Sequence, residues 1–280
     1  MIASVKGIDV YYESFGSGLP IVMIHGWGPD HRILKFCMEP IFQHFSLAFR
    51  RIYLDLPGMG KTKGALWIDG SDRMLEVLLA FIDRVLPDRD FLLVGESYGG
   101  YLARGIVDKA SARVSGLCLL CPIAKQETQR ENAPAFRVLE REKGIDELLG
   151  DDDRKYFETI SVKQNADVLF RFREGILPGL QAADFDFLGK CLGKAVPFSW
   201  NVDDPERRYD FPALFLAGRQ DSSVGYSDLG KIVELYPRAS FCVLDKAGHN
   251  LQIEQPELFS ALVREWLERV LYERGAESSG

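Results

Sequence analysis

A serine flanked by two glycines is the clearest chemical feature of the sequence. Ser97 stands in the run Gly95-Glu96-Ser97-Tyr98-Gly99. Apolar residues at 91–94 favour a strand buried on both faces before it, and apolar and small residues at helical spacing (98–107) favour a helix after it. Glycines permit a sharp turn there, which leaves the serine hydroxyl at the tip beside the helix N-terminus. That position suits a nucleophile, although the five-residue pattern alone is weak.

A serine hydroxyl is a useful nucleophile only when a base removes its proton and an acid orients that base. Asp221 follows a buried-strand pattern at 212–218, and His249 follows another at 240–244. Reactive groups gather at the carboxyl ends of parallel strands. We therefore expect Ser97, Asp221 and His249 at one edge of a sheet, where hydroxyl, base and acid could transfer a proton in sequence.

Other aspartates compete for the role of the acid. Asp245 lies four residues before His249, and Asp203 and Asp204 lie in a charged segment. We favour Asp221 because its Gly-Arg-Gln-Asp turn directly follows a buried strand. No other histidine follows the serine in the chain.

Four polar residues near these positions are predicted to support the site without reacting. His25 is expected to hydrogen-bond its own loop, Asp55 to hold its Pro-Gly loop together, and Glu254 to brace the histidine loop. Glu96 is expected to point away from Ser97, because neighbours on a tight turn diverge.

The elements that must position these residues alternate along the chain. Two short strands are expected within 2–15, and buried strands at 21–24, 51–56, 91–94, 114–120, 212–218 and 240–244. Helical patterns lie between and after them, as at 72–85 and 256–271. This alternation predicts an α/β fold with a mostly parallel central sheet of about eight strands and helices on both faces.

The alternation stops at Pro122 and resumes near residue 210. Residues 123–209 are charged and show little strand pattern, and helices are expected at 135–149 and 156–172. We interpret 123–209 as a helical cap (lid) inserted into a core made of residues 1–122 and 210–280.

Composition excludes several classes of function. The chain has 280 residues and a net charge of −7, which argues against nucleic acid or an anionic membrane as partner. No apolar run approaches the roughly 20 residues of a membrane span, and the N-terminus has no secretion-signal pattern, so a cytoplasmic location is expected. Five cysteines fit reduced thiols. Cys118 and Cys121 are expected to face opposite sides of one buried strand, and no metal site is predicted. The oligomeric state stays open.

The chain resembles the α/β-hydrolase family, in its serine-nucleophile branch of cap-containing esterases and carbon–carbon hydrolases. The matching motifs, in family order, are His25-Gly26-Trp27-Gly28, Asp55-Leu56-Pro57-Gly58-Met59-Gly60, Gly95-Glu96-Ser97-Tyr98-Gly99, Gly218-Arg219-Gln220-Asp221 and Gly248-His249. The resemblance implies Ser97 as nucleophile, Asp221 as orienting acid and His249 as general base, with no cofactor. It also implies an oxyanion hole from the backbone N–H groups of Trp27 and Tyr98. The cap lies where the family commonly inserts one.

The expected function is therefore hydrolysis of a small, partly apolar carboxylic ester through an acyl-enzyme, with Trp27 and Tyr98 contacting the substrate. Carbon–carbon hydrolysis of a dienoate-type ketoacid is an alternative, for which Arg219, Arg171 or Arg173 would bind the carboxylate. An aminopeptidase of the proline-iminopeptidase type would use acids of the cap, and a ligand receptor on this fold would barely turn over.

Overall fold

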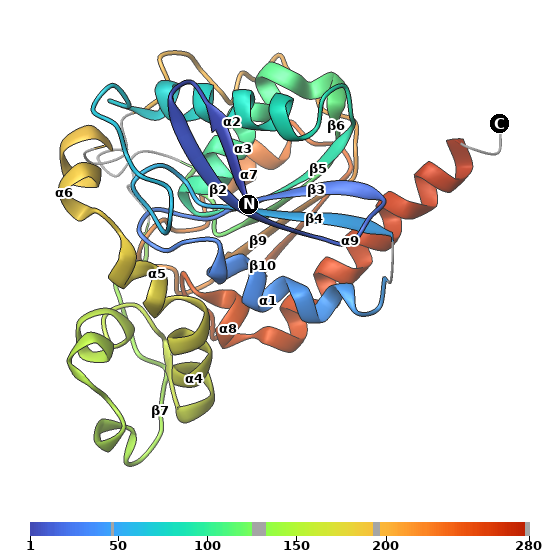
Figure 1. The fold of residues 1–280 in the computed structure, drawn as a ribbon. Coiled ribbons are helices and arrows are strands. Elements are labelled where there is room, and N and C mark those ends of the chain that lie inside the picture. The colour runs from blue at the N-terminus through green and yellow to red at the C-terminus, as the bar shows by residue number, and fades with distance from the viewer. Residues whose placement is uncertain (46–47, 125–132, 193–196, 278–280) are drawn as a thin grey trace.

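An eight-stranded sheet forms the centre of the molecule (Figure 1). The computed structural model describes residues 1–45, 48–124, 133–192 and 197–277. The strand order across the sheet is β1-β2-β4-β3-β5-β6-β9-β10. The strands are β1 (Ile2–Val5), β2 (Ile8–Phe15), β3 (Leu19–Ile24), β4 (Phe49–Leu54), β5 (Phe91–Glu96), β6 (Val114–Leu120), β9 (Ala213–Gly218) and β10 (Ala239–Leu244).

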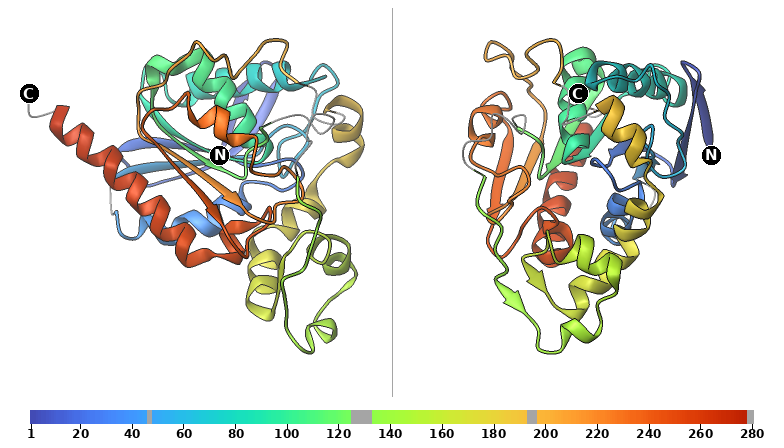
Figure 2. Two further views of the ribbon diagram at one scale, coloured as in Figure 1. Left: turned by 180° about the vertical axis from the view of Figure 1, so that it is seen from behind. Right: turned by 90° about the vertical axis from the view of Figure 1, so that its left-hand side faces the viewer.

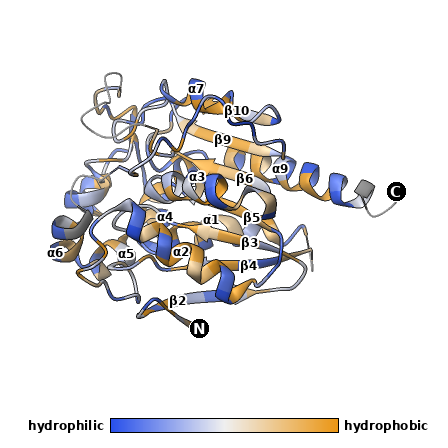
Figure 3. Ribbon diagram, turned by 90° about the horizontal axis from the view of Figure 1, so that it is seen from above, coloured by the Kyte–Doolittle hydropathy of each residue, from blue (hydrophilic) through white to orange (hydrophobic). Residues whose placement is uncertain are grey.

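The sheet is mostly parallel, as predicted. Only the β1–β2 and β2–β4 pairs are antiparallel, and β4, β3, β5, β6, β9 and β10 run in one direction. Every residue of β3, β5 and β9 is buried, which explains why their sequences are apolar except for Glu96 at the end of β5. Figure 3 shows these central strands as largely hydrophobic, between helices of mixed character.

Helices cover both faces of the sheet, which confirms the predicted layering. In Figure 1, α2, α3 and α7 lie above the sheet, and α1, α8 and α9 lie below it. Contacts between α2 and α3 and between α1 and α9 hold each layer together. The bounds are α1 (Arg32–Phe42), α2 (Ser71–Val85), α3 (Tyr98–Ala110), α7 (Leu229–Val233), α8 (Leu251–Glu254) and α9 (Pro256–Glu277), with a 3-10 turn at Ser111–Arg113.

Residues 133–192, called the insert below, lie beside the sheet at one end of the molecule (Figure 2). The insert contains β7 (Glu140–Arg141), β8 (Lys163–Gln164), α4 (Ala166–Gly175), α5 (Leu177–Ala182) and α6 (Phe185–Phe187). A 3-10 turn lies at Ile145–Glu147, and π-helical turns lie at Asp153–Phe157 and Leu188–Leu192. Helix α4 contacts α1 and α8 of the core, so this helix joins the insert to the layer that those two helices form.

The helices predicted at 135–149 and 156–172 are wrong in most of their length. Residues 140–141 form β7, which pairs in parallel with β8. Gly144 then adopts φ +85°, a left-handed conformation that ends any right-handed helix. Continuous α-helix begins only at α4, where the Asn165 side chain accepts the Val168 N–H and caps the helix.

Within the described ranges, no helix is both long and apolar enough to cross a bilayer.

Candidate active site

Ser97 occupies a sharp turn between β5 and α3. Its backbone has φ +51° and ψ −115°, a conformation that costs a non-glycine residue about 1–3 kcal/mol. A Cβ atom on Gly99 would lie 2.1 Å from the carbonyl oxygen of Ile24, and one on Gly95 would lie 2.6 Å from that of Gly99. Both glycines are therefore needed for the close approach of α3 to the ends of β3 and β5.

Ser97, His249 and Asp221 form a continuous chain of hydrogen bonds. His249 Nε2 lies 3.0 Å from Ser97 Oγ, and His249 Nδ1 lies 2.8 Å from Asp221 Oδ2. The other oxygen of Asp221 accepts the backbone N–H groups of Ser223 and Val224 at 2.9 and 3.0 Å. A carboxylate surrounded by donors accepts from Nδ1–H, which leaves Nε2 free to accept the serine proton.

The competing aspartates lie elsewhere. Asp245 is exposed and accepts from the Gln220 side chain at 2.8 Å. Asp203 pairs with buried Arg104 at 2.8 Å, and Asp204 accepts a nearby backbone N–H. The structure thus brings together the three residues favoured from the sequence.

His25 and Asp55 connect the loops that follow β3 and β4. The Leu56 N–H donates to His25 Nε2 at 3.0 Å, and His25 Nδ1 lies 2.8 Å from the Gly26 carbonyl oxygen. Burial lowers the pKa of His25, which suits a neutral ring that donates at one nitrogen and accepts at the other. Asp55 accepts the Lys61 N–H at 2.8 Å. Both residues therefore hold loops, as predicted.

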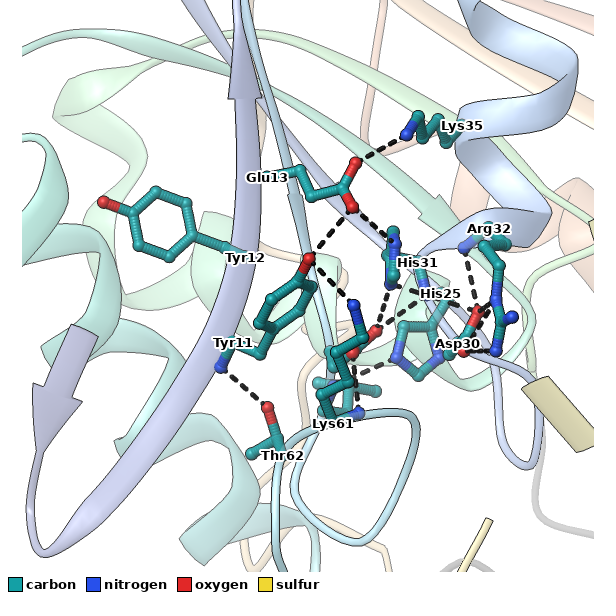
Figure 4. A network of polar contacts seen from close by, with 12 residues as sticks. Tyr11, Tyr12, Glu13, His25, Asp30, His31, Arg32, Lys35, Lys61 and Thr62 are labelled. Atoms are coloured by element: carbon teal, nitrogen blue, oxygen red, sulfur yellow. Dashed lines mark hydrogen bonds and ion pairs between the residues drawn. The ribbon is translucent and has the colours of Figure 1, made fainter. Parts of the chain in front are cut away.

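A polar network continues from these contacts to Asp30, His31 and Glu13 (Figure 4). His31 Nδ1 lies 2.7 Å from Asp55 Oδ1, and His31 Nε2 lies 3.4 Å from Glu13. Asp30 pairs with Arg32. The Asp30, His31 and Asp55 ligand atoms lie within 4.8 Å of one another, a spacing that a metal could use. Protein donors already contact both carboxylates, so we interpret the cluster as a brace for the loop that carries Trp27.

Trp27 and Tyr98, predicted to contact substrate, differ in their surroundings. The Trp27 side chain lines a cavity next to Ser97 and packs against Phe185 of the insert, with ring centroids 5.7 Å apart. The Tyr98 side chain is fully buried and its hydroxyl lies 3.1 Å from Ser71 Oγ. The predicted substrate contact of the Tyr98 side chain is therefore wrong, because its packing against α2 directs it away from the cavity.

The cavity above the serine has a volume of about 180 Å³ and is mainly apolar. Its lining comes from the core and from the insert: Trp27, Pro29, Ile33, Glu96, Ser97, Tyr156, Thr159, Ile160, Phe172, Ile176, Leu180, His249 and Asn250. Six of these side chains belong to the insert, between residues 156 and 180. Among these residues there is no lysine or arginine.

The prediction for Glu96 is wrong. Its carboxyl group lines the same cavity as Ser97, and Oε1 lies 3.6 Å from His249 Nε2. Burial raises the pKa of Glu96 to about 7, an effect that the charge of His249 and the Gly26 N–H partly offset. The two neighbours therefore do not diverge as expected for a tight turn, because both line the same cavity.

Glu254 braces the histidine loop, as predicted. Its Oε2 accepts the Gly248 N–H at 2.6 Å, and its Oε1 accepts the Val162 N–H of the insert at 2.7 Å. One buried side chain thus connects the loop of His249 to the insert. Burial raises the pKa of Glu254 to about 7.

Cys121 lies beneath the histidine loop. Strand β6 ends at Leu120, so Cys121 is not part of the strand, contrary to prediction. Its backbone has φ +42°, and its thiol donates to the Gly248 carbonyl oxygen at 3.6 Å. Burial raises the pKa of this thiol well above its ordinary value. Its sulfur and the ligand atoms of Asp221 and His249 lie within 4.8 Å of one another, but those two side chains already bind each other.

Comparisons with known proteins agree with this geometry. A family model described as alpha/beta hydrolase fold matches residues 20–256. A pimeloyl-[acyl-carrier protein] methyl ester esterase of Legionella pneumophila (strain Corby) is 24% identical over 269 residues, which cover 93% of this chain and 100% of the relative. The Aeromonas salmonicida (strain A449) protein of the same name is 28% identical over 267 residues, covering 92% and 98%.

Solved structures give the same result. The crystal structure of an alpha/beta superfamily hydrolase from Oenococcus oeni PSU-1 matches with a TM-score of 0.83 and 29% identity, covering 93% of this chain and 96% of that one. The family match spans most of the chain and includes the strands from β4 to β10 and the serine turn between β5 and α3. This chain belongs to the alpha/beta hydrolase fold family.

Proposed function

We propose that the protein is a serine hydrolase that cleaves a small, partly apolar carboxylic ester through an acyl-enzyme. One observation carries the proposal: the hydrogen-bonded chain from Ser97 through His249 to Asp221 opens on an apolar cavity. The names of the relatives, which are methyl ester esterases, support the ester as the bond cleaved.

In this mechanism Ser97 Oγ attacks the ester carbonyl as His249 Nε2 accepts the proton. Asp221 fixes the imidazole tautomer and stabilises the positive charge that the ring acquires. The imidazolium then protonates the leaving alcohol, and the same ring activates a water molecule that hydrolyses the acyl-enzyme.

The tetrahedral intermediate needs two donors for its oxyanion. The Tyr98 N–H is a good candidate because Tyr98 begins α3, where the first-turn N–H groups have no intrahelical partner. The Trp27 N–H is the second candidate, on the loop that His25 and His31 brace. Removing one such donor generally costs about 10²–10³ in rate.

Residues 123–209 would act as the cap. The described side chains of the insert that line the cavity, such as Tyr156 and Phe172, support this role because they cover the serine with apolar surface. Phe172 is fixed in turn by Phe157, with ring centroids 5.5 Å apart.

The cavity lining favours an ester over the other substrates considered. Arg171 pairs with Asp167 and Arg173 with Asp153, while Arg219 lies over the Tyr226 ring. No arginine is therefore placed for a ketoacid carboxylate among the described lining residues. The carboxyl group in that lining belongs to the core, not to the insert as an aminopeptidase of the type considered would need.

Labelling with a small fluorophosphonate tests the proposal. We expect one adduct on Ser97, located by mass spectrometry, and a fall in p-nitrophenyl butanoate hydrolysis of at least about 10³-fold in Ser97→Ala. Ser260→Ala, on α9 and outside the cavity lining, is the matched serine control and should keep full activity. A folded Ser97→Ala protein with wild-type hydrolysis would disprove the proposal.

A further inference from the structure

Glu96 is a buried residue of the cavity lining whose carboxyl group lies close to the His249 ring. It is the last residue of β5 and is 2% exposed, and it lines the cavity together with Ser97 and His249. Its Oε1 lies 3.6 Å from His249 Nε2, beyond hydrogen-bond distance. Its Oε2 is buried and has no well-formed hydrogen bond to any described residue. Buried polar groups are nearly always satisfied, so this group lacks a partner that a ligand could supply.

The neighbouring loop leaves room for this carboxyl group. A Cβ atom on Gly26 would lie 2.3 Å from Glu96 Oε2 and 2.9 Å from Ser97 Cβ. The backbone of Gly26 is not in the left-handed region, so the close approach explains the glycine rather than its conformation. The fold therefore accommodates Glu96 directly beside the nucleophile.

The surroundings of Glu96 favour a carboxyl group that can donate as well as accept a hydrogen bond. The charged or titratable groups that act on it are His249, from the loop before α8, and Asp221, from the loop after β9. The burial of Glu96 and the nearby Asp221 both disfavour the charged form of Glu96, whereas protonated His249 favours it. A neutral carboxyl is also compatible with an oxyanion forming nearby, which a second negative charge would oppose.

The position of Glu96 points to the alcohol side of the substrate. In the proposed mechanism the leaving oxygen must come within about 3 Å of His249 Nε2 to receive its proton. Glu96 Oε1 lies 3.6 Å from that same nitrogen, so substituents next to the leaving oxygen pass close to the carboxyl. The other lining atoms around this point are mostly apolar.

We propose that Glu96 is a substrate-binding residue that hydrogen-bonds a hydroxyl group on the alcohol portion of the ester, so that the preferred substrates are esters of diols or other hydroxylated alcohols. This inference rests on the proposed ester hydrolysis and adds the class of alcohol. A hydroxyl group both donates and accepts, and beyond the Gly26 N–H that already faces this carboxyl it would supply the hydrogen bond that Glu96 Oε2 lacks among the described residues.

Two isosteric esters test the inference: 2-hydroxyethyl butanoate and propyl butanoate, which differ by a hydroxyl in place of a methyl group. The measured quantity is the ratio of their kcat/KM values in wild type, Glu96→Gln and Glu96→Met. We expect Glu96→Met to lower the ratio about tenfold, which corresponds to about 1.4 kcal/mol, one hydrogen bond. Glu96→Gln should keep most of the preference because an amide also donates and accepts.

Fluorophosphonate labelling of Ser97 in each variant verifies that the site is intact. A ratio that stays within twofold of wild type in Glu96→Met would overturn the inference while ester hydrolysis stands. If that variant does not fold, the kcat/KM ratio of the wild type tests the inference. A tenfold preference of the wild type for the propyl ester would contradict a binding site for the substrate hydroxyl. Wild-type protein that cleaves neither ester would remove the proposed function and this inference together.

Discussion

Replacing Gly99 by alanine should destroy the serine turn. The added Cβ would lie 2.1 Å from the Ile24 carbonyl oxygen and 2.4 Å from that of His25, whereas ordinary contacts begin near 3.4 Å. The N-terminus of α3 would have to move about 1.3 Å from the end of β3, the difference between 3.4 and 2.1 Å. Both neighbours are backbone atoms of a buried strand end, so neither can rotate away.

Two costs follow from that displacement. Overpacking of this kind costs about 3 kcal/mol in the free energy of unfolding. Moving Ser97 by about 1 Å from His249 also costs about 10²-fold in rate. We expect both effects in Gly99→Ala, measured by urea unfolding and by the rate of fluorophosphonate labelling.

Gly230→Ala is the matched control. Gly230 lies in α7 and a Cβ there meets nothing within 4 Å. Alanine should therefore leave labelling unchanged and stabilise the helix by up to about 1 kcal/mol. Wild-type stability and labelling in Gly99→Ala would refute the reasoning, because α3 could then move from β3 without cost.

Three further predictions concern the carboxyl groups. Asp221→Asn should lower kcat by as much as about 10⁴-fold, because the amide would donate to His249 Nδ1 and favour the tautomer that carries its proton on Nε2. Steady-state kinetics on a variant with an unchanged melting temperature would test this. Glu96→Gln should gain stability relative to wild type by at most about 3 kcal/mol as pH rises from 5 to 8. The folded carboxyl titrates with a pKa of about 7 and the unfolded one near 4.5, so its contribution to wild-type stability is lost as pH rises through 7; parallel curves of unfolding free energy against pH would contradict it. Glu254→Ala should lower the free energy of unfolding by at least about 2 kcal/mol, because it leaves two buried N–H groups unpaired. The exposed control Glu257→Ala should change it by no more than about 0.5 kcal/mol. Equal urea midpoints for the two variants would show that Glu254 is not a brace.

The core of the fold could be predicted because its signals are local. Strands β3, β5 and β9 are buried on both faces and read as continuous apolar runs. Ser97 and Asp221 each follow such a run, and His249 follows β10, an edge strand that is mostly half-buried. Their meeting at one edge follows from the parallel direction of these strands.

The secondary structure of the insert could not be predicted in the same way, because its charged side chains form ion pairs with residues that are distant in the sequence. Arg141 pairs with Glu158 at 2.8 Å, a contact across 17 residues. Lys246 of the core pairs with Glu140 at 2.6 Å. A pattern of charged and apolar residues cannot distinguish such pairs from those on one helix, and the left-handed Gly144 decides against the helix.

The directions of the side chains on either side of Ser97 could not be predicted from the sequence for a related reason. Tyr98 is held by Ser71 of α2, and Glu96 lines the cavity where Gly26, which has no Cβ, leaves room for its carboxyl group. Both depend on tertiary packing around a strained turn, which the five-residue motif specifies only in part.

Three buried carboxyl groups lie around the His249 loop, and their different roles follow from the groups that each one contacts. Asp221 accepts two backbone N–H groups in addition to His249, so its charge is well solvated by the protein and can orient the ring. Glu254 accepts two N–H groups, one from the histidine loop and one from the insert, and so fixes the loop. Glu96 faces the ring at 3.6 Å without a comparable set of donors. Since each carboxyl is buried, its hydrogen-bond partners distinguish the three roles: Asp221 binds the imidazole as well as two backbone N–H groups, Glu254 braces two loops through two backbone N–H groups, and Glu96 lacks such a set.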